Sequence, residues 1–254
     1  MGKNKTAFWE EAGGIAAFTG RFIGQFLRPR YEFREFFRQC FIIGYQSLPL
    51  IGLTGFIMGL VLTIQLRPSL IEYGVESQLP AMISIAIIRE LGPVITALIF
   101  AGKIGSSMGA ELGSMKVTEQ IDAMEVSGTN PFKYLVVSRV LAATLMLPIL
   151  ALLADAIGLY GSYIGVNIRG YTSFRLFYFQ VTDILVYGDV IPAFIKTFFF
   201  GFAIGIVGCY KGYHSSKGTE GVGKSANSAV VVSSVMVFLI DLVAVQITDL
   251  LNLN

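Results

Sequence analysis

Five long apolar windows are the strongest constraint on what this chain can fold into. Each is close to the ~20 residues that an α-helix needs to cross a bilayer. The windows cover approximately residues 41–66, 79–101, 136–166, 191–210 and 229–251. Inside a bilayer the backbone N–H and C=O groups must pair with one another, which favours helices. The pattern predicts an all-α integral membrane protein with five transmembrane helices.

The composition supports this class and excludes several functions. Of 254 residues, 54% are hydrophobic and 14% charged, and the mean hydropathy of +0.67 is too high for a soluble domain. A net charge of +2 gives no indication of nucleic-acid binding. His214 is the only histidine, which argues against a histidine-ligated metal site, and Cys40 and Cys209 are expected to be free thiols. No acid/base pair stands beside a nucleophile, so we expect no catalysis by this chain.

The basic residues predict the orientation. Fourteen of the nineteen Lys and Arg residues fall in the N-terminal segment, in the stretch from Lys103 to Arg139 after the second window, or in the loop after the fourth window. Basic loops stay on the cytoplasmic side, so these segments are expected to be cytoplasmic. Five spans then place the N-terminus in the cytoplasm and the C-terminus, residues 252–254, on the opposite face of the membrane.

The first 40 residues differ from the five-span domain at 41–254. They contain no apolar run long enough for a signal peptide. Phe33, Phe36, Phe37, Cys40 and Phe41 follow helical spacing, with charged and polar residues on the other face. The pattern predicts an amphipathic helix lying in the membrane interface. The alternative is an ordinary helix packed on the protein's own spans.

The stretch from Arg89 to Pro131 joins the second span to a charged segment without a break. Small residues recur every fourth position at Ala101, Gly105, Gly109 and Gly113, a stripe that lets another helix approach closely. From Glu111 onward the composition becomes charged, and residues 109–126 are expected to form a short helix outside the bilayer that Gly128 and Pro131 end. Such a helix either couples an external motor to the membrane part or is only a linker.

Five charged residues lie inside or near the ends of windows: Arg89, Glu90, Asp155, Lys196 and Asp241. A charge near the bilayer centre costs at least ~2.5 kcal/mol, so none is expected to face lipid. They either pair with one another and fix helix packing, or line a cavity for a polar head group. Lys196 is the best candidate to contact an anionic head group.

Residues Gly218 to Ser225, GTEGVGKS, satisfy the P-loop pattern GxxxxGK[ST]. A P-loop follows a buried strand in a nucleotide-binding domain, and this run lies in a loop between two membrane spans. We expect the match to be accidental and the chain to bind no cofactor.

Four motifs in the central stretch resemble one protein family: RELGP at 89–93, AGKIGS at 101–106, AELG at 110–113 and MKVTEQIDAM at 115–124. They are similar to the signature of the MlaE/YrbE family, permease subunits of lipid-trafficking ABC transporters. The likeness extends from about Phe33 to the C-terminus.

This resemblance implies a homodimer in a bacterial inner membrane that moves phospholipid. It implies a separate cytoplasmic ATPase that binds ATP and Mg²⁺, a hexameric MCE-domain protein and, in some assemblies, a STAS-domain protein. It makes 109–126 the coupling helix that docks on the ATPase. The residues expected there are Glu111, Leu112, Met115, Thr118, Glu119 and Asp122. The competing interpretations are an ion-driven secondary transporter that uses Asp155 and Asp241, and a non-transporting membrane scaffold.

Overall fold

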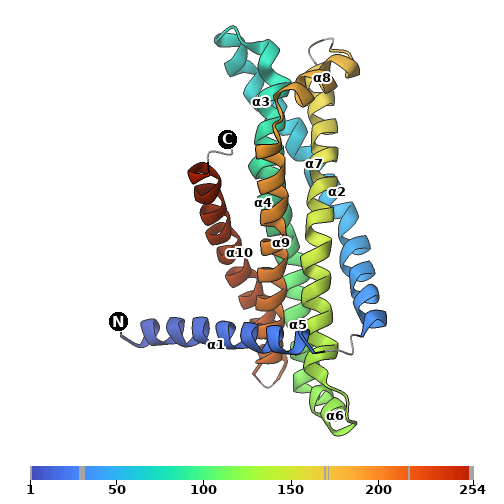
Figure 1. Cartoon of the computed structure of the whole chain (residues 1–254), viewed down its shortest axis with the longest axis vertical. Coiled ribbons are helices and arrows are strands. Elements are labelled where there is room, and N and C mark those ends of the chain that lie inside the picture. Colours follow the sequence, from blue (N-terminus) through green and yellow to red (C-terminus); the bar gives the residue numbers. More distant parts are fainter. Residues whose placement is uncertain (1, 29–31, 169, 171, 217, 252–254) are drawn as a thin grey trace. The chain divides into compact units, whose positions relative to one another are not determined.

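The computed structural model describes residues 2–28, 32–168, 170, 172–216 and 218–251, and within these ranges it contains helices and no strand (Figure 1). The α-helices are α1 (Gly2–Phe26), α2 (Phe33–Glu72), α3 (Leu79–Ala86), α4 (Gly92–Phe100), α5 (Ser106–Val117), α6 (Gln120–Val126), α7 (Ser138–Asn167), α8 (Phe174–Ile184), α9 (Tyr187–Tyr213) and α10 (Thr219–Leu250). A 3₁₀ turn, η1 (Glu76–Gln78), precedes α3. Three π-helical segments, η2 (Ile87–Leu91), η3 (Ala101–Gly105) and η4 (Phe132–Val137), continue into α-helices.

Five helical stretches are long and apolar enough to cross a membrane, which confirms the predicted fold class. They cover Phe33–Glu72, Glu76–Val117, Phe132–Asn167, Tyr187–Tyr213 and Thr219–Leu250. Each extends beyond its predicted window, because polar residues at the window ends continue the helix. The first span begins at Phe33 and passes residue 41 without a break, so the stripe at Phe33 to Cys40 belongs to the spanning helix.

The described chain forms two compact units. Unit 1 contains residues 1–45, 100–145 and 201–236, and unit 2 contains residues 46–99, 146–200 and 237–254. Each of the five spans therefore contributes one portion to each unit.

The small-residue stripe lies at the centre of unit 1. A Cβ on Gly109 would lie 3.2 Å from Ala226 of α10, and one on Gly208 of α9 would lie 3.1 Å from the carbonyl oxygen of Gly105. Gly113 likewise faces Ser215 and Val222. The predicted close approach of another helix is confirmed, and two helices, α9 and α10, make it.

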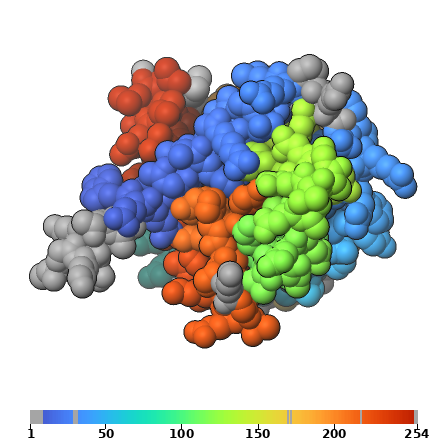
Figure 2. Space-filling view, turned by 90° about the horizontal axis from the view of Figure 1, so that it is seen from below, coloured from blue at the N-terminus to red at the C-terminus, as the bar shows by residue number. Residues whose placement is uncertain are grey.

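Within unit 1, helix α1 packs on η4 and α9 through aromatic side chains. Phe18 is buried, with ring centroids 5.0 Å from Phe132 of η4 and 5.6 Å from Tyr210 of α9. Figure 2 shows α1 (blue) beside the α6 region (green) and the α9–α10 turn (orange) on one face. Trp9 and Ile23 on other sides of α1 are exposed. One face of α1 therefore packs on the protein's own spans, and its position in the membrane interface stays a prediction.

In unit 2, α2 and α7 meet backbone to backbone. A Cβ on Gly55 would lie 2.8 Å from the carbonyl oxygen of Ala154, and one on Gly59 would overlap the carbonyl group of Gly158. Beside this contact, the Thr63 hydroxyl donates to Ser162 Oγ at 3.0 Å. Both helices therefore depend on the absence of side chains where they approach.

The segment between the third and fourth spans contains a helix that the sequence interpretation missed. Helix α8 begins after Ser173, whose hydroxyl accepts the N–H of Leu176 at 3.3 Å. Its buried side chains, Phe177 and Val181, join a core with Leu79 and Ile83. The 11 residues of α8 are too few to cross a bilayer, which is why a search for apolar windows overlooks them.

Replacing a glycine of α2 by alanine should test the close contact between α2 and α7. Gly59→Ala should lower stability by about 1–3 kcal/mol, the usual cost of overpacking, because the new Cβ meets the backbone of α7. We expect a lower temperature of loss of the monodisperse peak when heated protein in detergent is analysed by size exclusion. Gly52→Ala, on the same helix, is the control, since its Cβ meets only the end of Ile157 at 3.3 Å. Equal stability of the two variants would contradict the packing.

Candidate functional site

Unit 2 holds a cluster of buried and half-buried charges centred on Lys196. The Lys196 side chain is 5% exposed, and its Nζ lies 2.8 Å from Glu90 Oε2 and 2.8 Å from Asp241 Oδ1. These three residues come from α9, η2 and α10. The ammonium carries three N–H donors and is bonded to two carboxylates, so an ion triad joins three helices.

A second ion pair lies beside this triad. Arg89 Nη1 is 3.5 Å from Asp189 Oδ1, and Asp189 Oδ2 accepts the backbone N–H of Val186 at 3.3 Å. Asp189 stands in the first turn of α9, where a carboxylate is favoured by the free N–H groups of a helix start. Sequence reasoning missed Asp189, although an acidic residue just before a span was the available signal.

The cluster lines a small cavity of about 20 Å³, with Arg89, Glu90, Asp189 and Lys196 on its wall. That volume admits roughly one water molecule. Lys196 is therefore engaged in ion pairs, and its contact with a lipid head group stays a prediction. Of the two interpretations of the intramembrane charges, the contacts in unit 2 favour pairing for Arg89, Glu90, Lys196 and Asp241.

No hydrogen bond or salt bridge of the described residues joins Asp155 to this cluster, although Asp155 and Lys196 are close enough to interact electrostatically. Asp155 is buried on α7, and its Oδ1 has no hydrogen-bond partner among the described residues. The carboxylate occupies the place where a side chain on residue 92 would stand, so only glycine fits at Gly92. Asp155 lines a second cavity of about 20 Å³ with Pro93, Ala193 and Thr197. Asp155 and Asp241 therefore do not bond to each other, and their shared use as ion sites stays an untested alternative.

The predicted coupling segment belongs to unit 1 and is not a single helix. Helix α5 ends at Val117 and α6 begins at Gln120. Between them Glu119 has φ 58°, the left-handed region that non-glycine residues rarely adopt. The prediction of one helix over 109–126 is corrected to two helices with a turn at Thr118 and Glu119. Lys116 Nζ bonds Asp122 Oδ1 at 2.9 Å across this turn.

Two of the predicted docking residues serve the chain's own packing. Leu112 is fully buried, because its Cβ packs against the position of Gly212 on α9. Glu111 Oε1 lies 2.8 Å from Nη2 of Arg139, a buried residue of α7. An apolar residue on an amphipathic helix fits either a partner or the chain's own core, and here Leu112 lies in the core.

The exposed tip of this segment retains the remaining predicted residues. Thr118, Glu119 and Asp122 are exposed, and Met115 is half-buried. Val126, which sequence reasoning did not single out, is 90% exposed at the end of α6. We call residues 118–126 the α6 tip, a charged surface with one apolar side chain fully accessible.

The P-loop-like run follows a helix and not a strand. Helix α9 precedes it, and residues Thr219 to Ser225 form the first turns of α10. Only Gly218, with φ 90°, makes a turn. Helix α9 continues to Tyr213 and α10 begins at Thr219, so both helices extend into the predicted loop of about eighteen residues. No group of three or more metal-ligating side chains is found among the described residues.

Residues 36–247 match the family model described as permease MlaE. The chain belongs to the MlaE permease family. The match includes the charge cluster, the α5–α6 segment and all five spans, and it confirms the resemblance carried by the four motifs. Membership and the five apolar helices together make this MlaE-family chain a multi-pass inner-membrane protein.

Relatives of this MlaE-family chain cover nearly its whole length. A probable ABC transporter permease protein of Rickettsia typhi is 38% identical, over 94% of this chain and 92% of the relative. The intermembrane phospholipid transport system permease protein MlaE of Haemophilus influenzae is 33% identical, over 97% and 95%. The chloroplastic protein TRIGALACTOSYLDIACYLGLYCEROL 1 of Arabidopsis thaliana is 33% identical, over 90% and 65%.

The triad in this permease should behave as an electrostatic unit. Lys196→Met leaves Glu90 and Asp241 without their shared cation, and should cost about 3 kcal/mol, the low end for a broken buried pair because Glu90 is partly exposed. Thermal unfolding in detergent measures the loss. The control is the triple variant Lys196→Met, Glu90→Gln, Asp241→Asn, which removes every charge of the triad and should regain most of the stability. A single variant as stable as the parent would exclude the triad as a packing element.

Proposed function

We propose that this chain is the permease subunit of an ABC-type transporter that moves phospholipid between the inner membrane and periplasmic carriers or the outer membrane. The family match over residues 36–247 carries the proposal. The Haemophilus influenzae relative, named for intermembrane phospholipid transport, supports the substrate class.

The energy would come from a separate ATPase that binds ATP and Mg²⁺. The permease would transmit it through the stretch that runs from the two charged residues Arg89 and Glu90 to the α6 tip. This stretch is helical from Leu79 to Val117, and small residues hold its α5 portion against α9 and α10. A rigid, closely packed helix can pass a displacement along its axis, which a flexible linker cannot.

Docking on the ATPase would use the α6 tip. Val126 offers an accessible apolar contact, and Glu119, Asp122 and Glu125 surround it with charge. Specific interfaces combine a small desolvated centre with a polar rim, and the tip has this composition.

A homodimer would complete the lipid pathway. The cavity beside the charge cluster holds about 20 Å³ in one chain, far less than a lipid requires. Helix α10 has the least buried of the five apolar windows, and it exposes Val231, Val235, Phe238 and Leu242 at helical spacing. An MCE-domain protein, with a STAS-domain protein in some assemblies, would complete the transporter.

Single substitutions at the α6 tip should weaken ATPase binding without unfolding the permease. Val126→Asp should reduce affinity roughly tenfold or more, as expected for an interface hot spot. Copurification and the dissociation constant of the ATPase are the readouts. Ile23→Asp, an exposed apolar residue of α1, is the control. Normal ATPase binding by Val126→Asp would remove the tip from the docking role.

Two substitutions of Glu119 distinguish the effect of its carboxylate from the effect of its left-handed backbone conformation. Glu119→Gly keeps the left-handed turn, because glycine adopts positive φ readily, and removes only the carboxylate. Glu119→Val removes the carboxylate and strains the turn as well. We expect partial loss of ATPase binding with glycine and a larger loss with valine. Equal binding by both variants and the parent would show that neither the charge nor the turn matters.

The proposed orientation places the N-terminus and the α6 tip in the cytoplasm and the C-terminus in the periplasm. A cysteine at Val126 or at Leu251, both exposed, should be labelled from opposite sides in a Cys40→Ser background, since Cys209 is buried. Labelling of both from one side would contradict the five-span topology. The ion-driven alternative predicts lipid flux without ATP, and the scaffold alternative predicts no flux at all, so one assay in vesicles with and without ATP decides among the three.

A further inference from the structure

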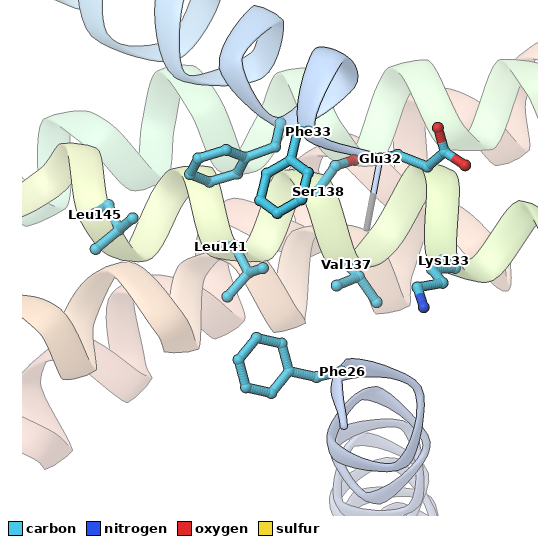
Figure 3. A pocket seen from close by; sticks show the side chains of 9 residues that line it. Phe26, Glu32, Phe33, Lys133, Val137, Ser138, Leu141 and Leu145 are labelled. Carbon is cyan, nitrogen blue, oxygen red and sulfur yellow. The ribbon is translucent and has the colours of Figure 1, made fainter. Parts of the chain in front are cut away.

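Unit 1 contains an apolar groove that the proposed transport function does not use. It has a volume of about 350 Å³ and lies between the end of α1, the start of α2 and the η4–α7 helix (Figure 3). Its apolar lining consists of Phe26, Phe33, Phe36, Val137, Leu141 and Leu145. The volume falls within the roughly 300–1,000 Å³ typical of small-molecule sites.

The interior of the groove is almost entirely apolar. Among the described lining residues, Ser138 is the only polar one apart from two charged residues at one end, and its hydroxyl donates to the carbonyl of Tyr134 in its own helix. Val137 and Ser138 are buried at the floor, whereas Phe33 and Leu145 are exposed at the rim. The wall therefore matches a hydrocarbon chain and disfavours a polar molecule.

The two charged residues give the groove a direction. Figure 3 shows Lys133 and Glu32 at the end opposite Leu145. Lys133 Nζ donates to the carbonyl of Arg28 at 2.7 Å, a bond that holds the ammonium at this end. A positive and a negative group thus stand together at one end of an apolar trough, an arrangement complementary to the phosphate and the amine of a zwitterionic head group.

The length of the groove agrees with one acyl chain. From Lys133 to Leu145 the helix rises roughly 18 Å at 1.5 Å per residue. One leaflet contributes about 15 Å, half of the ~30 Å hydrocarbon core. Since α2 and α7 are both candidate spans, and Phe37 and Phe41 beside the groove are exposed, this surface of unit 1 would meet the acyl region of the bilayer.

We propose that the groove binds one acyl chain of a zwitterionic phospholipid, with the phosphate at Lys133 and the amine at Glu32. The lipid is a resident ligand that fills the apolar gap in the corner formed by α1, α2 and η4. Protein bonds close the same corner on its polar side, where Asn130 Nδ2 donates to Gln25 Oε1 at 3.2 Å and the Tyr134 hydroxyl donates to Glu35 Oε2 at 3.2 Å.

Photo-crosslinking at two neighbouring residues tests the site. p-Benzoylphenylalanine is placed at Phe36, which lines the groove, or at Phe37, which is exposed on the same helix and does not. The full-length permease is reconstituted without ATPase or ATP in vesicles of phosphatidylethanolamine and phosphatidylglycerol in known ratio. This result is therefore independent of transport. Mass spectrometry of the adducts should show phosphatidylethanolamine enriched about two- to fivefold at Phe36, the effect of an exposed ion pair, and the vesicle ratio at Phe37.

Variants of Glu32 test the head-group contact. Glu32 is exposed, so Glu32→Gln and Glu32→Lys should leave folding intact. The first should abolish the enrichment at Phe36, and the second should reverse it in favour of phosphatidylglycerol. Leu141→Trp, which fills the groove, should remove the lipid adduct at Phe36 and spare that at Phe37. The proposal is overturned by equal lipid ratios at Phe36 and Phe37, by adducts at Phe36 to protein instead of lipid, or by a ratio that Glu32→Lys does not change.

Discussion

Direct contact between helix backbones is the constraint on which the rest of this structure depends. In a bilayer, lipid tails are as apolar as leucine, so helices gain little from burying apolar side chains and must associate by close packing. Gly105, Gly109 and Gly208 let α5, α9 and α10 approach in unit 1, and Gly59 and Gly158 do the same for α2 and α7 in unit 2. Where the backbones touch, a helix cannot slide without overlap, so each contact also fixes the register.

Fixed register is what makes buried charge tolerable. Lys196 needs carboxylates from η2 and α10 at hydrogen-bond distance, and an isolated ammonium in that place would be far more costly than the triad. Long-range attraction does not supply such geometry, because ion pairs lose most of their benefit when the partners move apart. The ion pairs therefore depend on the relative positions of η2, α9 and α10. Any function that moves these helices relative to one another must break or exchange the pairs.

The sequence predicted those parts of the structure that depend on repeated chemistry. The five spans and the stripe at Ala101 to Gly113 follow from periodic apolar or small residues, and both are confirmed. The break at Glu119 could not be predicted, because glutamate rarely adopts positive φ and nothing in residues 109–126 resembles a stop signal. Leu112 was assigned to a partner because an apolar side chain carries no information about which surface covers it. The pairing of Asp189 with Arg89 depends on residues one hundred positions apart, which a single sequence does not connect.

A single irregularity in the second span positions most of the buried charge. Pro93 has no N–H to give to the preceding turn, and the N–H of Gly92 bonds instead to the carbonyl of Ile87, which widens the turn of η2. The widened turn contains Arg89 and Glu90, two consecutive residues that reach different partners on α9, Asp189 and Lys196. The partners are seven residues apart, or about two helical turns, so they lie on the same side of α9. At the end of the same turn, the Asp155 carboxylate occupies the space that a side chain at Gly92 would need. The motif at residues 89–93 therefore sets the backbone geometry that directs Arg89 and Glu90 to their partners. Its glycine and proline contribute to the cluster together with the ionised side chains.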